Sequence, residues 1–289
     1  MFAYRHAFHA GNHADVLKHL VLSQVLRYMA EKDKPFTLVD THAGAGGYSL
    51  EGDYAHQGDE FATGIGALWA RKDLPPAVAD YVALVRAFNP GAKKLTQYPG
   101  SPGIANALLR ADDRLRLYEL HPTDHKILEA YLRERPQTQV FHSDGFASLK
   151  SELPPPSRRG VLLIDPSYEI KLDYARVVGA LREALTRFPQ CVVVIWYPQL
   201  QMLESAQLPQ RLRNAAEAAA APAKKGWLHV RLSVAKADER GFGLVGSGLF
   251  IANPPHTLHD ELQALLPWLV EVLGQHDGAS FLLEQSKVG

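Results

Sequence analysis

The sequence alternates between short apolar segments and longer stretches whose apolar residues recur at helical spacing. The segments that we predict to be strands are residues 36–40, 115–119, 138–142, 161–165 and 191–196. Helical patterns occupy residues 124–135, 146–153 and 174–188, and Asn12 is placed to cap an earlier helix that runs to Met29. Such alternation is typical of a parallel sheet covered by helices on both faces. We therefore expect an α/β fold.

The last third of the chain departs from this alternation. Residues 227–236 and 247–253 are two strand-like runs, and we expect them to form an antiparallel hairpin at one edge of the sheet. A helix is predicted over residues 259–272, and residues 279–283 could add a short strand. The sheet should therefore be mostly parallel, with an antiparallel edge.

The spacing between the first two predicted strands indicates an insertion. The first strand ends at Asp40, and the next begins near Arg114. A simple crossover between parallel strands needs far fewer residues. Helical patterns at residues 60–71 and 76–88 fill part of the gap. We expect residues 48–100 to form a small helical subdomain inserted into a main domain made of residues 1–47 and 101–289.

Composition limits the compartment and the partners that we expect. The chain has 289 residues, with 31 Lys and Arg balanced by 31 Asp and Glu. Its single cysteine, Cys191, excludes an intramolecular disulfide and fits a reducing, cytoplasmic compartment. The polar, His-rich start is not typical of a signal peptide, and no apolar run reaches the ~18 residues of a membrane span. Zero net charge removes the simplest argument for a nucleic-acid partner, so such a partner has to be inferred from a site.

A glycine-rich turn follows the first predicted strand. Gly44 and Gly46 would let the backbone approach a ligand closely and direct free N–H groups toward it. Ser49 stands where the dinucleotide fingerprint requires a third glycine, and no Gly-Lys-Ser/Thr follows. NAD, FAD and the phosphate loop of NTPases are therefore disfavoured. By itself the turn fits a tight structural bend as well as a cofactor loop.

Acidic residues lie at or just beyond four of the predicted strands: Asp40, Glu119, Asp144 and Asp165. Ligands of open α/β sheets bind outside the carboxyl ends of the strands, so these side chains should converge on one crevice. One such residue is ordinary as a helix cap, but four following a glycine turn favour a cofactor site.

The segment Asp165-Pro166-Ser167-Tyr168 follows the most apolar strand and fits methyl transfer to an exocyclic amine. The lone pair of that nitrogen is delocalised into the ring, and a carboxylate with a fixed backbone carbonyl would favour the reactive, pyramidal geometry. Tyr168 offers a ring on which a flipped base could stack. A type I turn with proline explains the same tetrapeptide. The similar residues 253–256 follow the hairpin, and we interpret them as strand-terminating.

Together these motifs resemble one known family. The segments that carry the resemblance are residues 4–19, 40–46, 98–102, 119–122, 144–146 and 157–166. They are similar to the bacterial large-subunit ribosomal RNA adenine-N6 methyltransferase J family, over nearly the whole chain. The resemblance implies a Rossmann-like fold that depends on S-adenosylmethionine, with a helical subdomain inserted after the first strand. It also implies methylation of one adenine N6 in 23S rRNA, on RNA rather than on the finished ribosome.

The resemblance also implies roles for individual residues. Cofactor contacts fall on His19, His42, Ser101, Glu119, Asp144, Gly145 and Asp165, beside Gly44 and Gly46 of the turn. Asp165 would be the proton acceptor, assisted by the Pro166 carbonyl, and Tyr168 and Tyr4 would contact the RNA. Ser167 replaces the second proline of the family pattern, which makes the placement of Tyr168 less certain than that of Asp165. Residues 1–12 would close over the cofactor.

Other functions stay open at this point. The nearest alternative keeps the chemistry but acts on adenine in DNA. A metal-dependent hydrolase could be built on the N-terminal histidines 6, 9, 13 and 19, although no Cys or Glu completes a recognised ligand spacing and we expect no metal. A non-catalytic RNA-binding protein could use the same scaffold. We expect 23S rRNA as the partner, with no membrane association and no obligatory protein partner.

Overall fold

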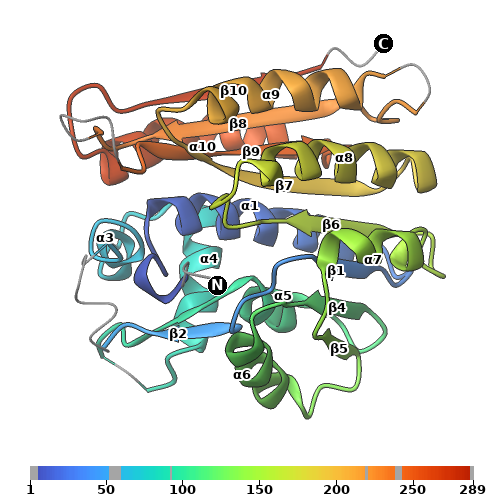
Figure 1. Cartoon of the computed structure of the whole chain (residues 1–289). Helices are drawn as coiled ribbons and strands as arrows, with labels where there is room; N and C mark the ends of the chain where they lie inside the picture. Colours follow the sequence, from blue (N-terminus) through green and yellow to red (C-terminus); the bar gives the residue numbers. More distant parts are fainter. Residues whose placement is uncertain (1–5, 52–59, 92, 219–220, 238–242, 287–289) are drawn as a thin grey trace.

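The computed structural model describes residues 6–51, 60–91, 93–218, 221–237 and 243–286 (Figure 1). Within these ranges the main sheet has eight strands in the order β10-β8-β9-β7-β6-β1-β4-β5. Their bounds are β1 Thr37–Asp40, β4 Arg114–Tyr118, β5 Thr138–Phe141, β6 Gly160–Ile164, β7 Val192–Gln199, β8 Trp227–Ser233, β9 Gly246–Ala252 and β10 Ser280–Gln285. Strands β7, β6, β1, β4 and β5 are parallel, whereas β9, β8 and β10 pair antiparallel.

The parallel half has a Rossmann-like strand order. Taken along the chain, its strands occupy positions 3-2-1-4-5, so the direction of winding reverses between β1 and β6. In open α/β sheets the ligand binds at this switch point, outside the carboxyl ends of the strands. The predicted α/β fold with a mostly parallel sheet is therefore confirmed.

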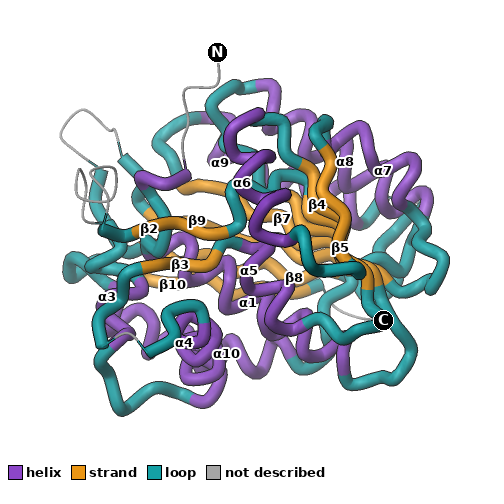
Figure 2. The backbone as a smooth tube through the Cα atoms, turned by 90° about the horizontal axis from the view of Figure 1, so that it is seen from below, coloured by secondary structure: helices purple, strands orange, loops and turns teal. Residues whose placement is uncertain are grey.

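The sheet separates two helical layers, as Figure 2 shows. Helices α1 His13–Ala30, α4 Pro76–Ala87, α5 Ser101–Leu108 and α10 Leu258–Leu273 share one buried cluster, and helices α7 Gly145–Glu152, α8 Leu172–Arg187 and α9 Leu203–Ala216 share the other. Successive strand side chains point to opposite faces, so Leu38 and Leu163 join the first cluster while Val39 and Leu162 join the second. Burial on both faces explains why these strands are apolar without alternation.

Local sequence signals set several helix boundaries. The side chain of Asn12 accepts hydrogen bonds from the backbone N–H groups of Ala14 (2.9 Å) and Asp15 (3.0 Å), as its predicted capping role requires. Helix α9 was not predicted, because Pro209 lies inside it and a proline is expected to break a helix. Leu208 and Leu212 nevertheless bury one face of that helix. None of the helices in the described ranges is long and apolar enough to cross a membrane.

The segment between β1 and β4 contains more than the predicted helices. Helix α4 matches its prediction, while α3 Ile65–Trp69 is shorter than the predicted 60–71. Two strands of 3 residues each, β2 Gly47–Ser49 and β3 Gln97–Pro99, pair antiparallel and bring the ends of the segment together. Such short strands carry no readable period. Helix α6 Pro122–Leu132 then follows β4.

The antiparallel half agrees with the predicted hairpin, with one correction at the edge. β8 pairs with β9 and β9 pairs with β7, but β10 pairs with β8 and is the outermost strand. After β9, Asn253 adopts a positive φ of 54° and its amide donates to the carbonyls of Pro189 and Cys191. These contacts fit the strand-terminating interpretation of residues 253–256.

Candidate active site

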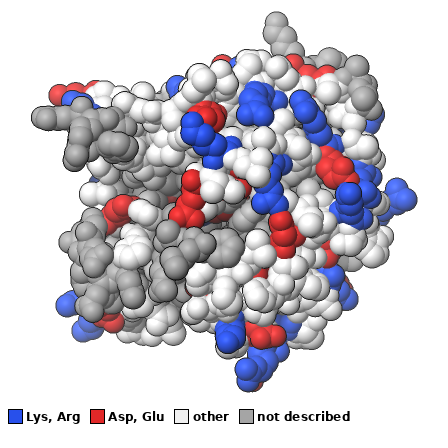
Figure 3. Space-filling model, in the orientation of Figure 1, with Lys and Arg blue, Asp and Glu red and all other residues white. Residues whose placement is uncertain are grey.

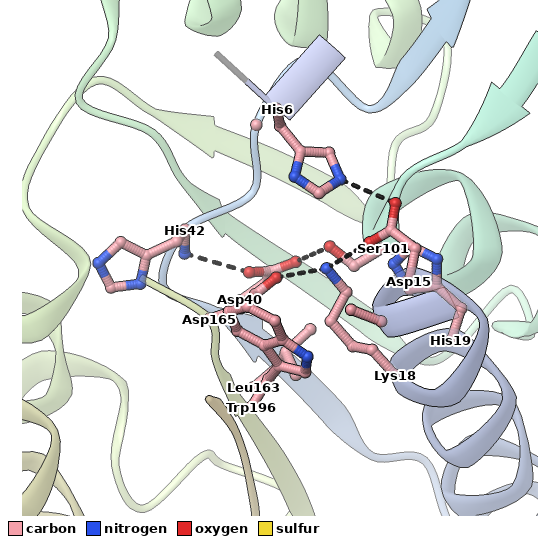
Figure 4. Close-up of polar contacts among 12 residues, drawn as sticks. His6, Asp15, Lys18, His19, Asp40, His42, Ser101, Leu163, Asp165 and Trp196 are labelled. Atoms are coloured by element: carbon pink, nitrogen blue, oxygen red, sulfur yellow. Dashed lines mark hydrogen bonds and ion pairs between the residues drawn. The ribbon is translucent and has the colours of Figure 1, made fainter. Parts of the chain in front are cut away.

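Two aspartates meet at the switch point of the sheet. Asp40 ends β1 and Asp165 follows β6, and these strands pair directly, with Asp40 opposite Leu163 (Figure 4). Glu119 follows β4, and Asp144 comes after β5. The four acidic residues therefore follow four adjacent parallel strands, as the sequence predicted. Their individual roles as ligands stay predictions.

The glycine turn between β1 and β2 holds Glu119 in place. The backbone N–H of Gly44 donates to Oε2 of Glu119 (2.8 Å), and that of His121 donates to Oε1 (2.6 Å). Burial raises the pKa of Glu119, and the two N–H groups oppose that rise. Gly44 has a φ of +62° and Gly46 a φ of +82°, backbone angles that residues other than glycine rarely adopt. A tight turn and a carboxylate at the strand end are thus built from the same few residues.

Asp40 connects this turn to the start of α5. Its carboxylate accepts hydrogen bonds from the N–H of His42 (3.1 Å) and from Oγ of Ser101 (2.7 Å). Burial raises the pKa of Asp40 to about 7, despite these two donors. Burial lowers the pKa of the His42 imidazole to about 4, so it is neutral at pH 7. Ser101, which the resemblance assigned to the cofactor, therefore also orders Asp40.

A row of charged side chains leads from Asp165 into α1. The ammonium of Lys18 lies 2.6 Å from Oδ2 of Asp165 and 2.8 Å from Oδ1 of Asp15. Oδ2 of Asp15 contacts Nε2 of His6 (2.9 Å) and accepts from the N–H of Gly11 (2.9 Å). The side chains of Lys18 and Asp15 are only 5% and 2% exposed. A buried charge is strongly destabilising unless it is paired, so each member depends on its neighbours.

The pKa values follow from this pairing. Burial would lower the pKa of Lys18, but the carboxylates of Asp15 and Asp165 outweigh it and raise that pKa. Burial would raise the pKa of Asp15, but His6 and Lys18 hold it well below its usual range. Sequence reasoning missed Lys18 and Asp15. The available signal was two opposite charges at i and i+3 in the first turns of a helix that is rich in apolar residues.

Tyr168 is buried beneath the site rather than exposed at its surface. Its side chain is 5% exposed, with a φ of 55° and its ring centroid 4.7 Å from that of Tyr174. The hydroxyl donates to the carbonyl of Trp196 (2.7 Å), and burial raises its pKa well above the usual range. In this structure the buried ring offers no open face to a base. The predicted stacking of a base on Tyr168 stays a prediction. Trp196, another residue that the sequence did not single out, has its ring centroid 5.6 Å from Nζ of Lys18.

His19 is a buried neutral imidazole with one nitrogen unused. Nδ1 contacts the hydroxyl of Tyr98 (2.7 Å), which in turn contacts the hydroxyl of Tyr81 (2.8 Å). Burial lowers the pKa of His19 to about 3. Nε2 is buried and has no hydrogen-bond partner among the described residues. Buried polar atoms are rarely left unpaired, so this nitrogen fits a role in holding a ligand.

Asp144 and Gly145 have structural duties as well as predicted ligand roles. Asp144 caps α7 by accepting from the N–H of Phe146 (2.9 Å), and its second oxygen pairs with the guanidinium of Arg176. A Cβ on Gly145 would lie 2.1 Å from the carbonyl oxygen of Thr41, so only glycine fits there. The start of α7 is thereby pressed against the residue that follows β1.

The remaining predictions concern the N-terminal segment. Tyr4 lies outside the described residues. His6 contacts Asp15, and His9 contacts Glu60 (3.0 Å), so these imidazoles pair with separate carboxylates. Within the described part of the chain, no group of three or more His, Cys, Asp or Glu side chains could hold a metal ion. The arrangement gives no support to the hydrolase alternative.

Comparisons with known proteins agree on one family. The family model described as "RsmJ: Ribosomal RNA large subunit methyltransferase D, RlmJ" matches residues 33–283. Ribosomal RNA large subunit methyltransferase J of Escherichia coli K12 is 42% identical over 269 residues, 93% of each chain. The protein of that name from Haemophilus influenzae is 40% identical over 284 residues, 98% of each chain.

A solved structure shares the fold over nearly the whole chain. A crystal structure of a Legionella pneumophila protein is 33% identical, has a TM-score of 0.86, and is matched over 96% of this chain and 99% of that one. The sequence relatives cover nearly the whole chain at well above 30% identity. This chain belongs to the ribosomal RNA large subunit methyltransferase J family.

Proposed function

We propose that this protein transfers a methyl group from S-adenosylmethionine to the N6 amine of one adenine in 23S rRNA, acting on free or incompletely assembled RNA. The observation that carries the proposal is the position of Asp165, at the switch point, followed by Pro166 and held by the buried Lys18. Relatives named as ribosomal RNA methyltransferases support RNA over DNA as the substrate. The single cysteine, Cys191, is free and fits a cytoplasmic protein.

The residues at the switch point fit the cofactor. His19 offers an unpaired buried nitrogen, and the turn at Gly44 and Gly46 needs positive φ angles. The residues that would hold the cofactor are His19, His42, Gly44, Gly46, Ser101, Glu119, Asp144, Gly145 and Asp165. When bound, S-adenosylmethionine supplies an electrophilic methyl group on a sulfonium sulfur.

Asp165 and Pro166 would prepare the amine. Lys18 contacts Oδ2 of Asp165, and we assign Oδ1 to accept one N–H of the adenine amine, while the Pro166 carbonyl accepts the other. These two acceptors favour a pyramidal nitrogen whose lone pair is free to attack. The neutral amine would form its new C–N bond before it loses a proton, because early loss of that proton is unfavourable. The methyl–sulfur bond would break in the same step, with its electron pair left on the sulfur. The proton then leaves to Asp165 or to water.

We also propose that residues 1–12 cover the cofactor and that residues 48–100 act as an inserted subdomain. Support comes from the contacts that tie these parts together. Nδ1 of His9 lies 3.0 Å from Glu60, and the amide of Asn12 donates to the same carboxylate (2.9 Å). His6 reaches Asp15 in the same region. Residues 6–12 are thus held both to α1 and to the insertion.

The test is labelled-methyl transfer to protein-free 23S rRNA from a strain that lacks the enzyme, with the modified nucleotide mapped by mass spectrometry. We expect one N6-methyladenine in 23S rRNA and no transfer to duplex DNA or to assembled large subunits. Asp165→Ala should abolish transfer while calorimetry still detects cofactor binding. Near-normal turnover of that variant would sink the mechanism, and no cofactor binding by the wild type would favour the non-catalytic alternative.

A further inference from the structure

Three large apolar side chains are exposed in the segments that lead from β6 into α8 and from β7 into α9. Ile170 is 53% exposed, Leu172 61% and Leu203 66%. Ile170 and Leu172 come shortly after Asp165, while Leu203 begins α9 after β7. We call these three residues the apolar rim. Since β6 and β7 are neighbouring parallel strands, both loops leave the sheet at the same end.

Two contacts hold the loops of the rim together. Nζ of Lys171 lies 2.7 Å from Oε1 of Glu204, so the residues next to Leu172 and Leu203 are paired across the gap. The hydroxyl of Tyr174 also contacts Sδ of Met202 at 3.7 Å. The rim is therefore one surface built from two segments, not three unrelated side chains.

Between Asp165 and the rim, the chain passes through a buried aromatic residue, Tyr168, which packs on Tyr174. Tyr168 and Tyr174 are 5% and 0% exposed, and their ring centroids are 4.7 Å apart. Tyr168 lies between Asp165 and Ile170 in the chain. The ring of Tyr168 is buried, whereas Ile170 and Leu172 are more than half exposed, so an incoming molecule can reach these apolar side chains shortly after Asp165.

The chemistry of the rim favours bases over phosphates. Lys171, between Ile170 and Leu172, has its charge paired with Glu204. Figure 3 shows acidic and basic side chains interspersed on the face that it draws, rather than one broad basic surface. An adenine that leaves its stack exposes the faces of the two neighbouring bases to water. Apolar side chains such as Leu and Ile stabilise unstacked steps by covering those faces.

We propose that the apolar rim contacts the bases that flank the target adenine once it has left the stack. This inference rests on the proposed function, because it requires an RNA adenine to reach Asp165. The occupant is a base face of the substrate RNA, and the rim thereby helps to hold the adenine out of its helix. It acts on substrate binding without touching the reacting atoms.

The experiment compares two RNA fragments after the methylated adenine has been mapped. One fragment carries the natural sequence around the target, and the other has abasic nucleotides on both sides of it. Leu172→Ser combined with Leu203→Ser should lower kcat/KM on the natural fragment about tenfold and on the abasic-flanked fragment less than twofold. Wild-type turnover on the natural fragment reports the proposed function, and the ratio between variant and wild type reports the rim.

The matched control is Ile127→Ser on α6, which removes an apolar side chain that is 48% exposed. It should leave kcat/KM on both fragments within twofold of wild type. Calorimetry with S-adenosylmethionine is the check that the double variant is folded, and we expect it to bind the cofactor as the wild type does. Equal losses on the two fragments, or an Ile127→Ser loss as large as that of the double variant, would overturn the base-contact role.

Discussion

The two halves of the sheet each contain a partly buried network of ionisable side chains, but the networks end differently. In the parallel half, His6, Asp15, Lys18 and Asp165 form what we call the site network, which ends at a strand terminus. In the antiparallel half, Tyr197, Arg213, His229 and Glu284 form the closed network, which links β7, α9, β8 and β10. The two differ in where the outermost carboxylate lies.

This difference separates function from stability. Asp165 follows the last residue of β6 at the switch point, where ligands of such sheets bind. His229 is 1% exposed, and its imidazole lies 2.7 Å from the hydroxyl of Tyr197 and 3.2 Å from Arg213. These contacts hold antiparallel strands and a helix together, on the side of β6 that faces away from β1. A buried charge network indicates a site only when one end reaches a place where substrate can bind.

The largest effect is expected from Lys18→Met in the site network. Losing the ammonium leaves Asp15 and Asp165 buried without their shared cation, which should cost about 3–5 kcal/mol of unfolding free energy. Methyl transfer should fall at least ~100-fold, because Asp165 loses its orientation. Urea unfolding and labelled-methyl transfer measure the two effects. The matched control is Arg213→Met in the closed network. It should lower stability while leaving the turnover of the folded enzyme unchanged. Equal losses of turnover in the two variants would contradict the distinction between a functional and a structural network.

Some residues of the site were predictable from the sequence and others were not. Asp40 and Asp165 were identifiable because each directly follows a short apolar strand, and parallel strands end at the same edge. Lys18 was not, because its partner Asp165 is 147 residues away and only the packing of α1 brings them together. His6 and Asp15 were identified as parts of a motif, but their contact with each other was not predicted. Local patterns therefore predicted which residues lie at the carboxyl ends of the strands, whereas the long-range ion pairs were found only in the structure.

The fold shows the same limit. The parallel strands were predictable from their apolar runs, but β2 and β3, at 3 residues each, are fixed by their pairing rather than by any period. Helix α9 was hidden by Pro209, which is tolerated because Leu208 and Leu212 pack into the core. β10 was expected only as a possible strand, and its pairing with β8 made it the edge. Tertiary packing overrides weak local signals in each case.

A glycine pair tests whether close packing at the switch point matters as much as charge. Gly145→Ala would place a Cβ 2.1 Å from the Thr41 carbonyl oxygen, so the start of α7 must shift. We expect a loss of about 2 kcal/mol in stability and weaker cofactor binding. Gly179→Ala in α8 is the control, since nothing lies within 4 Å of its added Cβ. It should stabilise the protein by about 0.5–1 kcal/mol, since alanine favours a helix; cofactor affinity equal to wild type in Gly145→Ala would remove Gly145 from the site.

Acid should weaken the closed network through His229. Burial lowers the pKa of His229 to about 4, below the 6.5 of a free imidazole. The stability that the neutral, buried imidazole contributes is therefore fully present above about pH 6.5. It is lost below that pH, as His229 of the unfolded state takes up a proton. The loss should reach about 2 kcal/mol at pH 5. In His229→Gln the free energy of unfolding should fall less steeply between pH 7 and 5, with turnover at pH 7.5 unchanged; an unaltered slope would show that this imidazole does not control the acid response.

The smallest effect is expected from Tyr168→Phe, which lies next to the site but is buried like a member of the closed network. Its hydroxyl donates to the Trp196 carbonyl at 2.7 Å, so removing it leaves a buried acceptor without that donor and should cost about 1 kcal/mol of stability. The ring, which packs against Tyr174, is retained. Methyl transfer should stay within threefold of wild type, because the hydroxyl faces the core rather than the amine. A fall of 100-fold or more with unchanged stability would mean that the hydroxyl takes part in the reaction, and would move Tyr168 from the packing beneath the site into the site itself.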